Sequence, residues 1–235
     1  MNFLERYRRG EYEQVWAELV ALGPAVRREP HLSQAREVAA ETMRRVRRNC
    51  DVLVSRLRAA GYTFGVYADG SRGYSSDGPL VPPSTSSRSD CSELEEQVGP
   101  LPLSLAAFWE EVGSVDFVGR HRSWSEGRDP LVVYPPEGAL SELDMVEEDE
   151  DGSIQFEACL APDDLHKDNT SGGAPYAIGL PDPCADSMVL NERHCLLFVP
   201  YLRLAILRWG GFPGLDGRQI QFEPLGGLIG GLEPF

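Results

Sequence analysis

The feature that most constrains the fold is a long apolar stripe at helical spacing between Ser33 and Gly61. Its positions recur after three or four residues, the period of a helix with one buried face; they are Met43, Val46, Cys50, Leu53, Leu57 and Ala60. Ser33 is the predicted N-cap, and Gly61 is the predicted terminator. The stripe predicts a long helix that packs, with an amphipathic helix near residues 12–20, as a hairpin on a main domain.

The same stripe could instead form the seam of a coiled-coil dimer. A seam needs about three to four clean heptads, and this stretch has fewer. The packed hairpin is therefore the favoured interpretation. A structural scaffold that dimerises through its N-terminal helices stays open as an alternative, so the chain is expected to be a monomer or a homodimer.

Residues 69–92 differ in composition from the segments on either side. They are rich in glycine, serine, proline and aspartate, and they contain few apolar residues. This composition is typical of a linker or a mobile loop. The predicted organisation is a helical N-terminal extension over residues 1–68, the linker over 69–92, and an α+β domain over 93–235.

Helices and short strand-like runs follow one another after the linker. Ser92 and Glu95 have capping-box spacing, and Ser104 is the predicted N-cap of the next helix. A last helix is predicted over 200–209 and an irregular tail over 226–231. The strand-like runs are 62–67, 115–118, 131–134, 154–159, 176–180, 188–190 and 219–222. Short connections favour antiparallel pairing, so the expected class is α+β, with a mainly antiparallel sheet packed by helices and an N-terminal helical extension.

The segment 94–113 contains a glutamate in a short helix, a Leu-Pro step, and a second helix with a hydroxyl residue, an aromatic pair and a final glycine. The matching residues are Glu95, Leu101, Pro102, Ser104, Phe108, Trp109 and Gly113. This order resembles the opening of the SUKH superfamily, which includes yeast cell-wall assembly regulators and many bacterial immunity proteins. The resemblance covers residues 90–210; residues 1–68 have no counterpart in the minimal domain. It implies an α+β fold and a binding activity, typically toward toxin domains, with no catalytic residues.

The charge and the cysteines restrict the environment and the partner. The formal net charge of −15 disfavours a nucleic-acid surface and suits a basic partner. The cysteines are odd in number and form no CxxC, so neither a disulfide framework nor a zinc site is expected. The charged N-terminus does not resemble a signal peptide, and no apolar run is long enough for a membrane span. We therefore expect a cytoplasmic protein without a cofactor or metal.

Seven carboxylates fall within the ten positions 142–151. They indicate a solvated surface first and a contact face for a basic partner second. The candidate contact residues in this run are Glu147, Glu148, Asp149, Glu150 and Asp151, with Trp124 as a candidate aromatic anchor from a polar loop. The run imitates the first half of a calcium loop, but Ala158 stands where that loop requires a glutamate.

His166 lies in the densest polar loop of the sequence and completes the set of candidate binding residues. We expect a non-catalytic protein-binding domain, either a toxin-neutralising immunity protein or a regulatory binding module. The alternative is a hydrolase-like enzyme in which His166 acts with Asp163, Asp168 or Cys184. A deep polar pocket around His166 would favour the enzyme, and a shallow acidic face would favour the binding module.

Overall fold

The computed structural model describes residues 2–67, 69–73, 78–123, 128–143, 145, 156–216 and 225–235. The helices in these residues are α1 (Phe3–Arg8), α2 (Tyr12–Ala21), α3 (His31–Ala59), α4 (Ser87–Val98), α5 (Leu103–Glu111), α6 (Pro136–Leu143), α7 (Phe198–Arg203) and α8 (Leu225–Ile229). The strands are β1 (Thr63–Phe64), β2 (Leu80–Val81), β3 (Ser114–Asp116), β4 (Gly119–Arg120), β5 (Val132–Val133), β6 (Phe156–Ala161) and β7 (Tyr176–Leu180). Helices and small antiparallel sheets occur together, which confirms the predicted α+β class.

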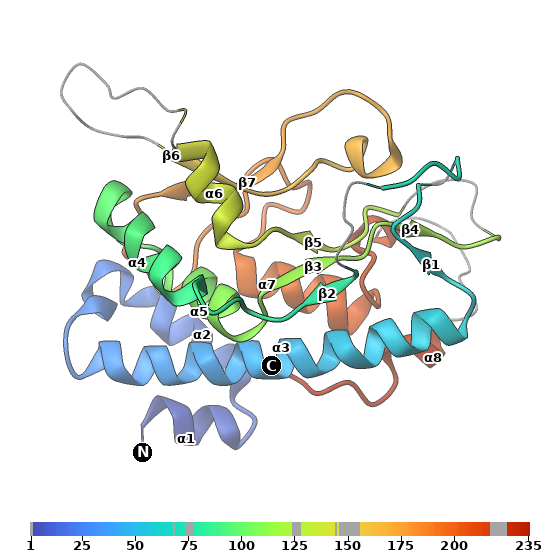
Figure 1. The fold of residues 1–235 in the computed structure, drawn as a ribbon. Helices are drawn as coiled ribbons and strands as arrows, with labels where there is room; N and C mark the ends of the chain where they lie inside the picture. The colour runs from blue at the N-terminus through green and yellow to red at the C-terminus, as the bar shows by residue number, and fades with distance from the viewer. Residues whose placement is uncertain are drawn as a thin grey trace.

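Helix α3 is the long element on which much of the molecule is assembled. Figure 1 shows it running beneath α5 and β2, with α1 on its other side. The predicted stripe faces inward: Met43, Val46, Cys50, Leu53 and Leu57 are all buried. Burying such an apolar face stabilises the fold by roughly 25 cal/mol per Å² of apolar surface removed from water.

The stripe of α3 is covered by the chain itself. Met43, Leu53 and Leu57 are at most 1% exposed within a single copy. The residues that would form a coiled-coil seam are therefore already packed. The apolar side chains buried in residues 1–68 and in 93–235 belong to one continuous cluster. The boundaries of the N-terminal extension and of the linker over 69–92 stay a prediction.

Within the described residues the strands form three small sheets, with orders β1-β4, β2-β3-β5 and β6-β7, and every pair among them is antiparallel. Strand β7 has the predicted bounds, whereas 62–67 shortens to β1. Residues 188–190 make only isolated bridges, from Met188 to Leu197 and from Leu190 to Ala177. Residues 154, 155 and 219–222 lie outside the described part of the chain. In β6, buried Phe156 and Ala158 alternate with exposed Glu157, as a half-buried strand requires.

The helix starts differ from the predicted ones because the serines bond elsewhere. Ser33 donates to Glu29 Oε1 at 2.7 Å while α3 begins at His31. Helix α4 begins at Ser87, and Ser92 lies inside it with its hydroxyl on the carbonyl of Arg88. The predicted capping box at residue 92 is therefore wrong, and the predicted cap at Ser33 is wrong for the same reason.

Ser104 does not cap α5 either. Helix α5 starts after Pro102, and the Ser104 hydroxyl donates to Asp186 Oδ1 at 2.7 Å. Gly113 ends this helix with φ +87°, and a Cβ there would lie 2.4 Å from the carbonyl oxygen of Val81. Glycine is thus required by both the backbone angle and the close approach of β2.

Two segments near the C-terminus also differ from the predicted structure. Helix α7 continues as a π-helical turn over Leu204–Arg208, within the predicted helix 200–209. The tail predicted to be irregular instead contains α8, which packs on α3. Leu228 of α8 is buried, and this apolar contact explains why a glycine-rich segment forms a helix. In the described part of the chain, no helix has both the length and the apolar character to cross a bilayer.

Candidate functional site

One of the seven candidate binding residues lies in the described part of the chain, and that residue is His166. Trp124 and the acidic residues Glu147, Glu148, Asp149, Glu150 and Asp151 lie outside the described residues. The acidic run is the connection from α6 to β6 in the sequence, and His166 lies in the next connection, between β6 and β7. The candidate site in the described residues is therefore the loop over residues 162–175.

Asp163 sets the local shape of this loop. Its Oδ1 accepts the backbone N–H groups of Leu165 at 2.9 Å and His166 at 3.3 Å, and its Oδ2 bonds to His166 Nδ1. A side chain that accepts from the backbone two residues later makes the turn that aspartate favours. Asp163 is buried, while the His166 side chain is 48% exposed. The carboxylate thus holds the imidazole ring at the surface in a fixed orientation.

Lys167 anchors the same loop from below. Its ammonium bonds to Asp129 Oδ1 at 2.6 Å, and its side chain is fully buried. The Tyr176 hydroxyl donates to Asp129 Oδ2 at 3.1 Å, and the ammonium lies 4.3 Å from the centre of the Tyr176 ring. Both carboxylate oxygens of Asp129 are therefore paired. Removing one partner of such a buried ion pair leaves an uncompensated charge in the interior. The pair therefore holds the loop in one position.

A third contact joins the loop to the segment after β1. Asn169 has the left-handed angle φ +58°, which asparagine tolerates better than most residues. Its amide Nδ2 donates to Asp69 Oδ2 at 3.2 Å. The N–H and hydroxyl of Ser71 also donate to Asp69, and together these bonds lower the pKa of Asp69. The loop is thus fixed at three points before any ligand binds.

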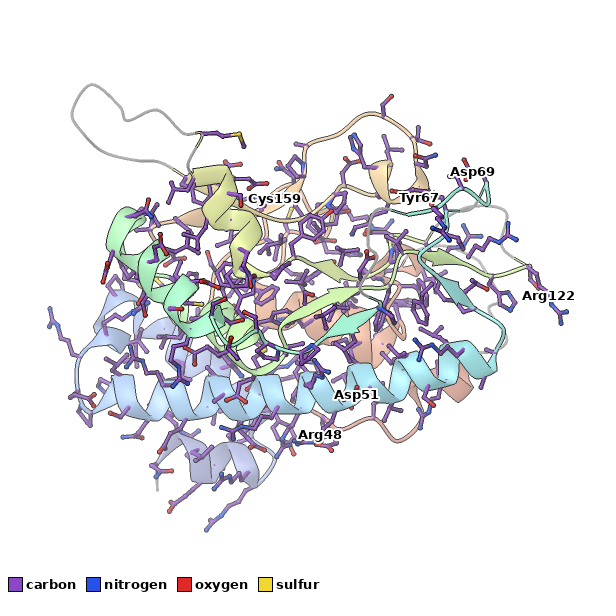
Figure 2. All side chains as sticks on the ribbon, viewed as in Figure 1. Arg48, Asp51, Tyr67, Asp69, Arg122 and Cys159 are labelled. Atoms are coloured by element: carbon purple, nitrogen blue, oxygen red, sulfur yellow. The ribbon has the colours of Figure 1, made fainter. Side chains whose placement is uncertain are left out.

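A cavity of about 510 Å³ lies beside the loop. This volume is within the usual range for small-ligand pockets, about 300–1,000 Å³. Its walls come from three parts of the chain: Tyr67 follows β1, Tyr134 follows β5, and Cys159 belongs to β6. The loop supplies the remaining lining residues, which are Pro162, Asp163, His166, Asn169, Thr170, Ser171 and Pro175. In Figure 2, Tyr67 and Cys159 both lie on the side of the molecule away from Asp51 of α3.

The titratable groups at this cavity have separate environments. Burial and the nearby Glu142 carboxylate raise the pKa of the Cys159 thiol to about 11. Burial alone would raise the pKa of Asp163, but the hydrogen bonds from His166 and from the backbone outweigh it, so this pKa is lowered. At neutral pH the cavity therefore presents a protonated thiol and an ionised aspartate that is already occupied by the turn.

The structure brings together only part of the constellation considered for hydrolysis. His166 and Asp163 are paired, whereas Asp168 and Cys184 do not line the cavity. Cys184 lies near the start of α5, where its carbonyl accepts from Leu103, and burial with Asp182 raises its pKa to about 11. Within the described ranges, no group of three or more His, Cys, Asp or Glu side chains is placed to hold a metal ion.

Sequence reasoning missed Tyr67, Tyr134 and Cys159 as parts of the site. Each lies in or beside a short strand and gives no local signal, because only the fold brings these segments together. Lys167 carries a signal in the sequence, because it is the single lysine of the chain. A lone lysine among aspartates indicates a specific ion pair more strongly than a lysine in a lysine-rich surface would.

Comparisons with known proteins add no assignment to this site. A scan against protein-family models, a search of curated proteins and a search of solved structures each found no match. The resemblance of segment 94–113 to the SUKH superfamily therefore stays a prediction. In the structure, the matching residues Phe108, Trp109 and Ser104 are fully buried. Their described contacts are with the protein's own core.

Proposed function

We propose that this chain is a non-catalytic protein-binding domain whose contact surface is the loop over 162–175 together with the cavity beside it. The observation that carries the proposal is the threefold fixing of this loop by Asp163, by Lys167 and by Asn169. A loop already held in its binding conformation loses less conformational entropy on association. These bonds hold an otherwise exposed polar segment in one shape, which suits recognition.

The surface composition supports the same proposal. Leu165 is 44% exposed beside exposed His166, so an apolar group and an imidazole stand together at the tip of the loop. The net charge of −15 favours a basic partner, because complementary charge increases the rate of encounter. A toxin-neutralising immunity protein or a regulatory binding module fits these properties. The acidic residues 147–151 would add long-range attraction.

We also propose a cytoplasmic location, on the basis of the cysteines. All five cysteines are free, and Cys50 and Cys91 are buried. Unpaired thiols persist in a reducing compartment. This part of the proposal is independent of the binding loop, and fractionation of cells with an antibody against the chain tests it.

The binding proposal is tested by capture with matched baits. The loop variant combines Leu165→Ser and His166→Ala, which removes one exposed apolar side chain and one exposed polar side chain. The control combines Val52→Ser and Asp51→Asn, a comparable pair of exposed residues on α3. A partner identified by mass spectrometry should be enriched by the wild type and by the control, and lost by the loop variant. Equal enrichment by all three proteins would contradict the proposal.

A hydrolase-like enzyme is the second candidate, and the His166–Asp163 pair at a 510 Å³ cavity favours it. With Nδ1 held by the carboxylate, Nε2 is the nitrogen left to take a proton from a water molecule. A panel of chromogenic esters, amides and phosphoesters tests this candidate. Turnover that disappears in His166→Gln and persists in Cys184→Ser would support the enzyme over the binding domain.

A further inference from the structure

The cavity beside the loop has two aromatic walls. Tyr67 and Tyr134 come from different segments, and Pro162 and Pro175 add apolar surface to the same lining. Tyrosine rings carry negative charge density on their faces, and they attract a cation that lies within about 6 Å of the ring centre. The chain already uses this interaction next to the cavity, where the Lys167 ammonium lies over the ring of Tyr176.

Three carboxylates lie near the aromatic walls, those of Asp116, Glu142 and Asp69. Burial is the main cause of the raised pKa of Tyr134, and the carboxylates of Asp116 and Glu142 add to it. Glu142 also accepts the backbone N–H of Cys159, a residue of the cavity wall, at 3.3 Å. Asp69 reaches the rim through its bond to Asn169. The nearby ammonium of Lys167 is already paired with the carboxylate of Asp129.

We propose that this cavity receives an arginine side chain of the partner, with the guanidinium between Tyr67 and Tyr134. The inference rests on the proposed binding function and names the chemistry that the site recognises. Guanidinium is planar, so it stacks on an aromatic face while its five N–H groups remain available for hydrogen bonds. Thr170 and Ser171 line the same cavity, and their side chains carry hydroxyl acceptors. The surrounding carboxylates supply the complementary charge.

A pair of peptides tests the inference without knowledge of the partner. The probe is acetyl-Gly-Arg-Gly-amide, and the control peptide carries citrulline, which has nearly the same shape and no charge. Binding is followed by two-dimensional NMR of the labelled full chain at low ionic strength. We expect the arginine peptide to shift resonances of residues 67–71, 134 and 162–175, and to bind at least about tenfold more tightly than the citrulline peptide.

Two variants locate the binding event. Tyr134→Leu should weaken the arginine peptide about fivefold, because it removes one ring face. The backbone carbonyl that accepts from Trp109 remains in this variant, so the fold is retained. Asp69→Asn is exposed and nearly isosteric, and it should weaken the peptide about twofold and reduce the salt dependence. The control Val52→Ser/Asp51→Asn should bind as the wild type does.

Failure of this inference is distinguishable from failure of the proposed function. Equal affinity for the two peptides, or no shift at the cavity with the arginine peptide, would overturn the arginine site. If the loop variant still lost the captured partner in that case, the binding function would stand and the recognised group would differ. An arginine peptide that binds with unchanged affinity to Tyr134→Leu would also overturn the inference.

Discussion

Helix α3 and the loop over 162–175 are held in place by different kinds of interaction. The helix is fixed by apolar side chains such as Met43 and Leu53, which pack against α5 and its neighbours. The loop is fixed by directional polar bonds at Asp163, Lys167 and Asn169. Burial of apolar surface is nondirectional and stabilises the whole molecule, whereas a paired buried charge specifies one local geometry. The difference separates the region that keeps the protein folded from the region that we propose recognises a partner.

The largest expected effect is in the apolar region, at Trp109 of α5. Its ring is fully buried, and its Nε1 donates to the carbonyl of Tyr134 at 2.9 Å. Trp109→Ala should lower the free energy of unfolding by about 4 kcal/mol, measured by denaturant unfolding. A variant with wild-type stability that lost only partner binding would show that Trp109 acts in recognition. It would contradict the assignment of the apolar region to folding alone.

The second effect is in the polar region, at Lys167. Replacing it with methionine removes the ammonium and leaves the buried Asp129 carboxylate without this counter-ion, while its bond from the Tyr176 hydroxyl remains. We expect a loss of about 3 kcal/mol in the free energy of unfolding, with faster hydrogen exchange over 162–175 than in α3. The double variant Lys167→Met/Asp129→Asn should recover part of the loss. Uniformly faster exchange in α3 and the loop would show that the two regions are not separable.

The third effect concerns Asp186, a buried carboxyl outside both regions that joins α5 to α7 through Ser104 and Val199. Burial raises the pKa of Asp186 to about 7, against the hydrogen bonds from Ser104 and from the backbone of Val199. A carboxyl with a raised pKa in the folded protein binds its proton more tightly there than in the unfolded chain. Its contribution to stability is therefore complete below about pH 4 and is lost as the pH rises through about 7.

The wild type should accordingly lose roughly 4 kcal/mol relative to Asp186→Asn between pH 4 and pH 8. Chemical denaturation at several pH values measures the difference between the two proteins, which removes contributions from other groups. A constant difference across this range would show that Asp186 has the same pKa in the folded and unfolded states.

The smallest effect on stability is expected in the acidic run. Replacing Glu147, Glu148, Asp149 and Glu150 with glutamine or asparagine should leave the melting temperature nearly unchanged or raise it slightly, because like charges this close in the sequence repel one another and stabilise the fold little. The same changes should slow association with a basic partner and flatten its salt dependence. Calcium should not shift the melting temperature of the wild type. A calcium-dependent stabilisation that is absent in the variant would establish a metal site instead.

The sequence was sufficient where local pattern and final packing coincide. The stripe of α3 could be predicted because its period persists over many turns, and the antiparallel pairing followed from the short connections. The helix starts could not be predicted, because Ser104 bonds to Asp186, which is distant in the sequence. Lys167 likewise forms its ion pair with Asp129, which is 38 residues away in the sequence. Choices of this kind depend on tertiary proximity, which no local window contains.

The site was predictable to the same limited extent. His166 and Asp163 lie three residues apart, and their pairing follows from the turn that they share. The cavity, in contrast, also needs Tyr67 after β1, Tyr134 after β5 and Cys159 of β6, three segments with no common pattern. Its aromatic walls therefore emerge only from the fold. For this reason the sequence indicated a polar loop, and the structure indicates a pocket.

The central claim is that a partner binds the loop over 162–175 and its cavity, and a hydrogen-exchange footprint tests it most directly. Amide exchange of the full chain is compared with and without the captured partner. With the partner bound, we predict slower amide exchange over residues 156–175 and 67–71, and unchanged exchange in the exposed face of α3 around Asp51. Protection confined to α3, with unchanged exchange over 156–175, would contradict it.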